Sequence, residues 1–230
     1  MKNSWRVESK EGLAEVLREI NLKVPLHSEG GRKDPVERYC IARLLHSVPS
    51  HRLQFPLNLN HRERPDFVLS MPRIKIGIEH TEVVSQNAAN ASAIRERGLG
   101  PEVYFSWHSE PGEQILSSKK IIEKIEDDKF PRPLYGDSVE RNTADAILHS
   151  INNKKKKCSA EGFDRYEQNW LLMDNNWGGL NCNLRKMVEI LIPKLAEQDM
   201  GIVFDSVFIL SRREMCEIGK HVDFYPVNEI

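Results

Sequence analysis

Two acidic residues, Asp66 and Glu79, stand where they could share one divalent cation. Asp66 leads into an expected strand over residues 67–71, and Glu79 lies late in the next expected strand, over residues 73–84. Adjacent strands lie about 4.8 Å apart, so carboxylates at their ends can meet at one ion. Mg²⁺ prefers oxygen ligands of this kind and keeps several of its waters. Such an ion can activate a bound water and neutralise charge on a phosphodiester.

The alternation of the second strand predicts which side chains accompany Glu79. Isoleucines at positions 74, 76 and 78 alternate with small or polar residues, which is typical of a strand with two different faces. If the isoleucines face the core, the other surface carries Lys75, Gly77, Glu79 and Thr81. The pattern also suits a plain solvated strand, with Asp66 as a turn residue after Pro65, so these residues alone leave both interpretations open.

A third carboxylate, Glu37, lies on a helix expected from Asp34 to about Val48. The apolar stripe of this helix is centred on Glu37 and consists of Val36, Cys40, Ile41, Leu44, Leu45 and Val48. A carboxylate that points inward needs a partner, either a metal-bound water or a basic residue. Alternatively, Asp34 is the N-cap and Glu37 folds back as the third residue of a capping box. The capping interpretation is preferred, and the two are compatible.

The composition is that of an ordinary globular protein of 230 residues, with 40% hydrophobic residues and a net charge of −1. No apolar run is long enough for a transmembrane helix, and the first residues do not resemble a secretory signal. The cysteines are scattered, which argues against a disulfide framework and favours a cytoplasmic location. They are Cys40, Cys158, Cys182 and Cys216. The near-neutral charge excludes a histone-like polycation but not a local nucleic-acid site.

Helices and strands are expected to alternate in a single α/β domain over residues 1–230, of which 1–33 could form an N-terminal helical extension. The expected helices cover residues 11–22, 34–48, 85–97, 115–127, 139–153 and 184–198. Besides the two strands above, strands are expected over residues 103–107, 170–174, 202–210 and 221–227. Residues 49–65 are rich in Pro, Asn, His and Arg and are expected to be irregular.

The order of these motifs resembles the PD-(D/E)XK nuclease superfamily, which has the restriction-endonuclease-like fold. The resemblance covers residues 34–176 and rests on short motifs. These are the helix with Glu37, then Pro65-Asp66-Phe67, Ile78-Glu79-His80-Thr81, a helix starting near Gln86, and a lysine-ended helix before Trp170-Leu171-Leu172-Met173-Asp174.

The resemblance implies a central mixed sheet flanked by helices. It also implies that Asp66 and Glu79 are metal ligands, with the backbone carbonyl of His80 as a third. Glu37 would be the accessory helix carboxylate, and Gln86 a supporting polar residue.

One position departs from the family pattern. The lysine that the family places two residues after the second acid corresponds here to Thr81, which can hydrogen-bond but carries no charge. Lys75 lies on the same strand face but about 13 Å from Glu79, too far to substitute simply. A lysine from another element could take its place, although the sequence does not identify one. The threonine at position 81 therefore weakens the prediction of catalysis more than it weakens the prediction of the fold.

Two further groups of residues have competing interpretations. The lysine run Lys154, Lys155, Lys156 and Lys157 could contact nucleic-acid phosphates, or it could be a solvated helix end. His80 and Glu82 could form a zinc site with His51 and His61. Nothing in their spacing supports such a site, so scattered polar histidines are the preferred interpretation.

The sequence analysis thus predicts a Mg²⁺-dependent nuclease that acts on DNA, with Mn²⁺ as a substitute ion and no membrane partner. Asp66 and Glu79 would hold the metal, Glu37 would support it or its water, and Thr81 would position the nucleophile. One alternative is a nucleic-acid-binding protein on the same fold that has lost catalysis. Another is a protein-interaction scaffold, which would show no salt-sensitive affinity for nucleic acid.

Overall fold

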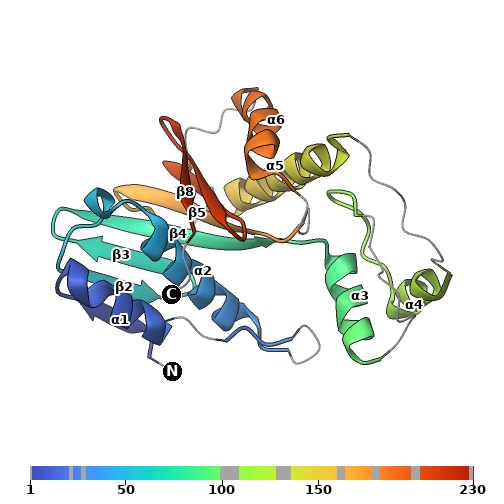
Figure 1. The fold of residues 1–230 in the computed structure, drawn as a ribbon, viewed down its shortest axis with the longest axis horizontal. Coiled ribbons are helices and arrows are strands. Elements are labelled where there is room, and N and C mark those ends of the chain that lie inside the picture. The colour runs from blue at the N-terminus through green and yellow to red at the C-terminus, as the bar shows by residue number, and fades with distance from the viewer. Residues whose placement is uncertain are drawn as a thin grey trace.

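One mixed sheet of eight strands forms the centre of the protein, as a computed structural model shows (Figure 1). The structure describes residues 2–20, 23–26, 30–98, 109–127, 136–159, 164–177, 182–197, 203–227 and 230. The strands lie side by side in chain order: β1 Ser4–Val7, β2 Leu57–His61, β3 Phe67–Met71, β4 Ile74–Val83, β5 Gln168–Asn175, β6 Ser206–Leu210, β7 Glu214–Ile218 and β8 Val222–Pro226. The first four strands are antiparallel to one another, β4, β5 and β6 are parallel, and β6 to β8 are again antiparallel.

Six α-helices flank the sheet within the described residues, which confirms the predicted α/β class with a central mixed sheet. They are α1 Lys10–Ile20, α2 Lys33–Ser47, α3 Gln86–Glu96, α4 Ser118–Asp127, α5 Ser138–Cys158 and α6 Leu184–Ala196. None of the described helices is both long enough and apolar enough to span a bilayer. The parallel pairing of β4 with β5 requires a crossover, and helices α3 to α5 lie in that connection.

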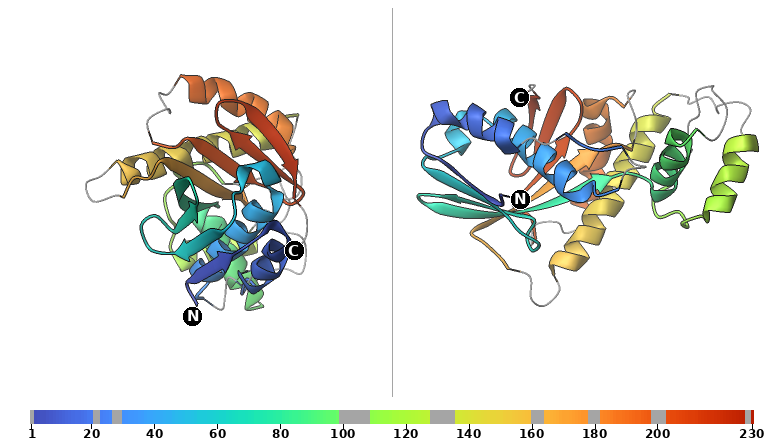
Figure 2. Two further views of the ribbon diagram at one scale, coloured as in Figure 1. Left: turned by 90° about the vertical axis from the view of Figure 1, so that its left-hand side faces the viewer. Right: turned by 90° about the horizontal axis from the view of Figure 1, so that it is seen from below.

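Two separate cores show which helices cover which face of the sheet. Leu17 and Ile41, from α1 and α2, pack with sheet residues such as Ile78 in the first core. Ile147 of α5 and Leu191 of α6 belong to the second core, on the opposite face. Helices α3 and α4 stand apart beyond the end of β4 and share a small cluster of their own (Figures 1 and 2).

The alternation predicted for β4 is present and assigns its side chains to these faces. Ile76 and Ile78 are buried in the core beneath α2. Because successive strand residues point to opposite faces, Glu79 projects toward α5, whereas His80 projects toward α2. Strand β4 therefore presents a carboxylate to α5 on one face and an imidazole ring to α2 on the other.

The sequence analysis missed three strands, β1, β2 and β7. Residues 49–65 were expected to be irregular because of their Asn, Pro and His content. In the structure Leu57 and Leu59 alternate with Asn58 and Asn60, and the two leucines are buried in the core. Residues 1–33 were a candidate helical extension; of these, Ser4–Val7 pair with β2 at the edge of the sheet. The strand expected over residues 103–107 lies outside the described residues.

Gly77 on β4 generates a testable prediction about packing beside Glu79. A Cβ atom at this position would lie 2.7 Å from Cδ2 of Tyr166 and 3.2 Å from Cγ of Pro65. Neither ring can yield easily, so we expect Gly77→Ala to destabilise the fold by about 1–3 kcal/mol. The matched control is Gly12→Ala on α1, where the new Cβ meets nothing within 4 Å and helix propensity favours alanine. Urea unfolding checks both; equal stability of the two variants would contradict the prediction.

Candidate metal-dependent active site

Asp66 and Glu79 lie opposite each other on neighbouring strands. Antiparallel β3 and β4 pair Phe67 with Ile78, and the next pair in this register is Asp66 with Glu79. Both are buried, with 5% and 7% of their surface exposed. The backbone N–H of His80 donates to Oδ2 of Asp66 at 2.7 Å, which fixes this carboxylate at the start of β3. Two like charges thus face each other with little water to screen them.

The side chain of Lys154 from α5 reaches both carboxylates. Its Nζ donates to Oε2 of Glu79 at 2.6 Å and lies 3.7 Å from Oδ2 of Asp66. The sequence analysis assigned Lys154 to a phosphate-binding run, together with Lys155, Lys156 and Lys157. The structure instead places Lys154 in the acidic pair, while Lys156 and Lys157 are exposed. Lys154 therefore brings a positive charge to the acidic pair from another element.

A helical spacing in the sequence could have identified Lys154. Ile147 and Ile151 of α5 are buried against the sheet, and so is Cys158. Lys154 is three residues after Ile151 and four before Cys158, so it belongs to the same stripe. Treating residues 154–157 as one charge run concealed this difference between the first lysine and the others.

Burial and like charge control the ionisation of the pair. Burial raises the pKa of Asp66 to about 6, and the charge of Glu79 adds to this, although Lys154 acts in the opposite direction. For Lys154, burial lowers the pKa, but the attraction of Asp66 and Glu79 outweighs it and the net pKa is raised. The Lys154 ammonium is therefore held between two acids, and Asp66 is the acid that loses its proton only near pH 6.

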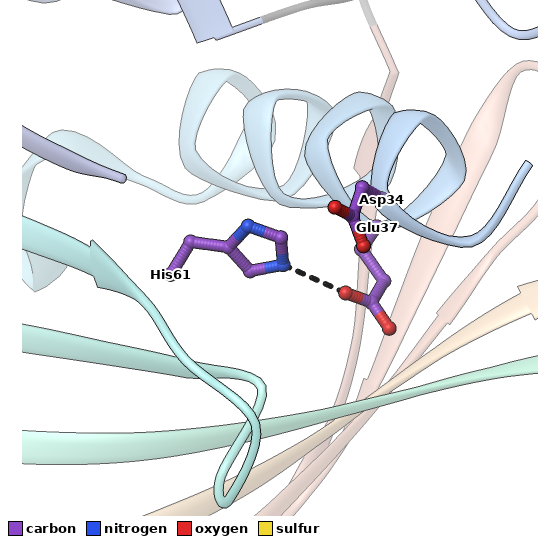
Figure 3. A group of neighbouring side chains, drawn as sticks. All are labelled: Asp34, Glu37 and His61. Atoms are coloured by element: carbon purple, nitrogen blue, oxygen red, sulfur yellow. Dashed lines mark hydrogen bonds and ion pairs between the residues drawn. The ribbon is translucent and has the colours of Figure 1, made fainter. Parts of the chain in front are cut away.

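Glu37 lies on the other side of the sheet, at the face covered by α2. It points inward, as the apolar stripe predicted, and is only 3% exposed. His61 at the end of β2 supplies its partner: Nε2 of His61 and Oε2 of Glu37 are 2.7 Å apart (Figure 3). Burial raises the pKa of Glu37, but the hydrogen bond from His61 and the charge of Lys33 leave it lowered overall.

The preferred capping-box interpretation of α2 is wrong. The helix begins at Lys33, its N-cap is Arg32, and no side chain caps it. Asp34 is instead the second helical residue. The side chain of Glu37 reaches His61 on β2 rather than folding back onto the backbone of its own helix. The partner of Glu37 is thus the basic residue that the burial argument required.

The remaining predicted site residues are Thr81, Gln86 and His80, and their side chains are not part of the contacts among Asp66, Glu79 and Lys154. Thr81 lies two residues beyond Glu79 on the same strand face and is half-buried. Gln86 is exposed at the start of α3, where its amide donates to Oδ1 of Asn90 at 3.0 Å. His80 takes part through its backbone N–H, and its ring projects to the α2 face. Burial lowers the pKa of that ring to about 4, so it is neutral at pH 7.

A polar groove of about 540 Å³ runs over the outer part of the sheet beside the acidic pair. Val68 and Ser70 of β3 form part of its floor and continue the strand face that begins with Asp66. Hydroxyl, amide and cationic side chains surround them. The full lining is Asn3, Ser4, Asn60, His61, Arg62, Val68, Ser70, Lys75 and Tyr166. Arg62 donates to the Tyr166 hydroxyl at 2.8 Å, which holds both side chains at the groove.

No protein family model, curated protein or solved structure matches this chain.

The raised pKa of Asp66 generates a prediction about stability. Because the folded protein binds this proton more tightly than the unfolded chain does, the stability that Asp66 contributes is present at low pH and is lost as pH rises from about 4 through about 6. The Asp66→Asn variant has no carboxyl group to ionise at this position, so it does not lose this stability as the pH rises. We expect the metal-free variant to be more stable than the native chain by about 2 kcal/mol at pH 8, with the difference vanishing near pH 4.

Thermal unfolding in chelator across this pH range measures the effect. Glu15→Gln on α1 provides the control, because it removes an exposed carboxylate and leaves the acidic pair unchanged. A stability gain in Asp66→Asn that is the same at pH 4 and pH 8 would contradict the assignment.

Proposed function

We propose that this protein is a metal-dependent nuclease that hydrolyses phosphodiester bonds of DNA. The observation that supports the proposal most strongly is the position of Lys154, whose ammonium lies between two buried carboxylates on neighbouring strands. The resemblance to the PD-(D/E)XK superfamily calls for two acids and a lysine, and these three residues supply them from β3, β4 and α5. DNA is the substrate that the resemblance favours.

Asp66 and Glu79 fit a hard divalent cation. They offer carboxylate oxygens in a buried, partly desolvated site, which is the donor set that Mg²⁺ takes and Mn²⁺ tolerates. When bound, the ion would lower the pKa of a water and neutralise charge on the phosphate. Since the pKa of Asp66 is raised to about 6, half of these carboxyl groups are protonated near pH 6, and metal affinity should fall as pH drops through that value.

Lys154 has two roles in this proposal. Without metal, its charge offsets the repulsion between the two acids, which would otherwise destabilise the folded state. With metal, the acids no longer need it, and a protonated ammonium remains beside the reacting phosphate. A lysine ammonium is ordinarily protonated at neutral pH, so it would stabilise the negative charge that develops in the transition state.

The position of Lys154 also bears on the inactive-protein alternative. That alternative was based on Thr81, which cannot supply a charge. Lys154 supplies the charge from α5 instead, so a threonine at position 81 is compatible with catalysis and Thr81 needs only to hydrogen-bond a water or a phosphate oxygen.

Lysine substitutions test the proposal directly. We expect Lys154→Met to reduce Mg²⁺-dependent cleavage of linear or supercoiled DNA by about 10²–10³-fold, because one transition-state contact is lost. Metal binding should persist, since both carboxylates remain. Lys119→Met on α4 is the control, because this lysine is 87% exposed and outside the acidic pair, and the variant should cleave nearly normally. Cleavage that survives in Lys154→Met, or in a chain with Asp66→Asn and Glu79→Gln, would contradict the proposal.

The polar groove generates a separate prediction about substrate binding. Arg62 and Lys75 would each contact one phosphate, so Arg62→Ala and Lys75→Ala should each lower the salt dependence of DNA affinity by about one ion. Lys119→Ala on α4 is the control, because this lysine is 87% exposed and distant in the fold. Fluorescence anisotropy with labelled duplex and single-stranded DNA, at several salt concentrations, measures the slopes. Unchanged slopes in both groove variants would place the substrate elsewhere.

A further inference from the structure

The α2 face of the sheet carries a second group of potential metal ligands, distinct from Asp66 and Glu79. Asp34 and Glu37 of α2 and His61 of β2 each bring one ligand atom, and these three atoms lie within 4.8 Å of one another (Figure 3). Glu37 is buried and Asp34 is exposed, so the cluster opens to solvent on one side. Together the three residues offer one imidazole nitrogen and two carboxylate oxygens.

A fourth residue of the same face, His80, has a buried ring nitrogen without a hydrogen-bond partner among the described residues. His80 is only 7% exposed, and its Nε2 has no hydrogen-bond partner within the described part of the chain. Its ring follows Ile78 by two residues on β4, so it projects to the same face as Phe67, on which His61 stacks at 4.6 Å. Of the charged groups that act on the pKa of this ring, Glu37 of the cluster has the largest effect, followed by Lys154 and Lys33. A buried ring nitrogen without a partner is costly unless something binds it.

We propose that Asp34, Glu37 and His61 bind a divalent transition-metal ion, Mn²⁺ or Zn²⁺, with His80 as an additional donor, direct or through a bound water. Imidazole nitrogen suits such ions, whereas a site built only from oxygens would suit Mg²⁺ or Ca²⁺. The ion would take the place of the proton that now joins His61 to Glu37. Lys33, whose Nζ lies 3.6 Å from Oε1 of Glu37, is 73% exposed at its side chain and can swing into solvent.

This site differs in chemistry and in location from the one assigned to catalysis. The catalytic pair faces α5 and has only oxygen ligands, whereas this cluster faces α2 and includes nitrogen. The inference therefore does not depend on nuclease activity. It does reassign Glu37, which the sequence analysis placed with the catalytic metal, to a site of its own.

Metal binding to the full chain tests the inference. Titration with Mn²⁺ and with Zn²⁺ gives the number of ions bound, and electron spin echo spectroscopy of the Mn²⁺ form detects directly bound imidazole nitrogen. Besides an ion at Asp66 and Glu79, we expect one further ion per chain whose affinity falls at least tenfold in His61→Gln and in Glu37→Gln, with the nitrogen signal reduced in His61→Gln if Mn²⁺ occupies the site. His80→Ala should weaken binding by about tenfold, as loss of a supporting residue typically does.

Two variants separate this site from the catalytic one. Asp66→Asn should abolish the oxygen-only site and leave the histidine-dependent ion in place, so failure of one proposal is distinguishable from failure of the other. His51→Gln changes an exposed histidine in another part of the fold and should have no effect. If neither Mn²⁺ nor Zn²⁺ binds in a way that depends on His61, while circular dichroism shows that His61→Gln is folded, the inference is overturned.

Discussion

Two carboxylates of like charge facing each other across β3 and β4 are the constraint around which the candidate site is arranged. The register that pairs Phe67 with Ile78 forces Asp66 and Glu79 into opposition, and the burial of both raises the cost of their repulsion. Within the two strands, the backbone N–H of His80 relieves part of this repulsion by donating to Asp66. A cation has to come from elsewhere, and α5 provides Lys154. The same arrangement is the one on which the proposed nuclease activity depends.

The alternation of side chains along β4 places a carboxylate and an imidazole ring on opposite faces of the sheet. Glu79 and His80 are neighbours in the chain, yet one side chain projects toward α5 and the other toward α2. Asp66 joins the two faces, because its carboxylate accepts a hydrogen bond from the backbone of His80 and its pKa is raised in part by the charge of Glu37. A change in charge on either face is therefore felt on the other. This coupling links the charge of the α2 cluster to the ionisation of the acidic pair.

Much of this arrangement follows from local sequence patterns, and the rest depends on contacts distant in the chain. The alternation of Ile74, Ile76 and Ile78 correctly predicts β4 and the face of Glu79, and the apolar stripe of α2 correctly points Glu37 inward. The partner of Glu37 could not be predicted, because His61 belongs to a strand whose asparagines and histidines are typical of a loop. The pairing of Lys154 with Glu79 spans 75 residues, and only the helical stripe of α5 indicates it.

X-ray diffraction from crystals of the full chain soaked in Mn²⁺ shows whether Asp66 and Glu79 together bind a divalent ion beside Lys154. Anomalous scattering from manganese locates the ion without assumptions about its ligands. We expect a peak within about 2.5 Å of carboxylate oxygens from both Asp66 and Glu79, with the Lys154 ammonium displaced from Glu79 but still adjacent. A map with no peak between these carboxylates, and with Lys154 still bonded to Glu79, would rule out the proposed metal site and leave the lysine as a structural counter-ion.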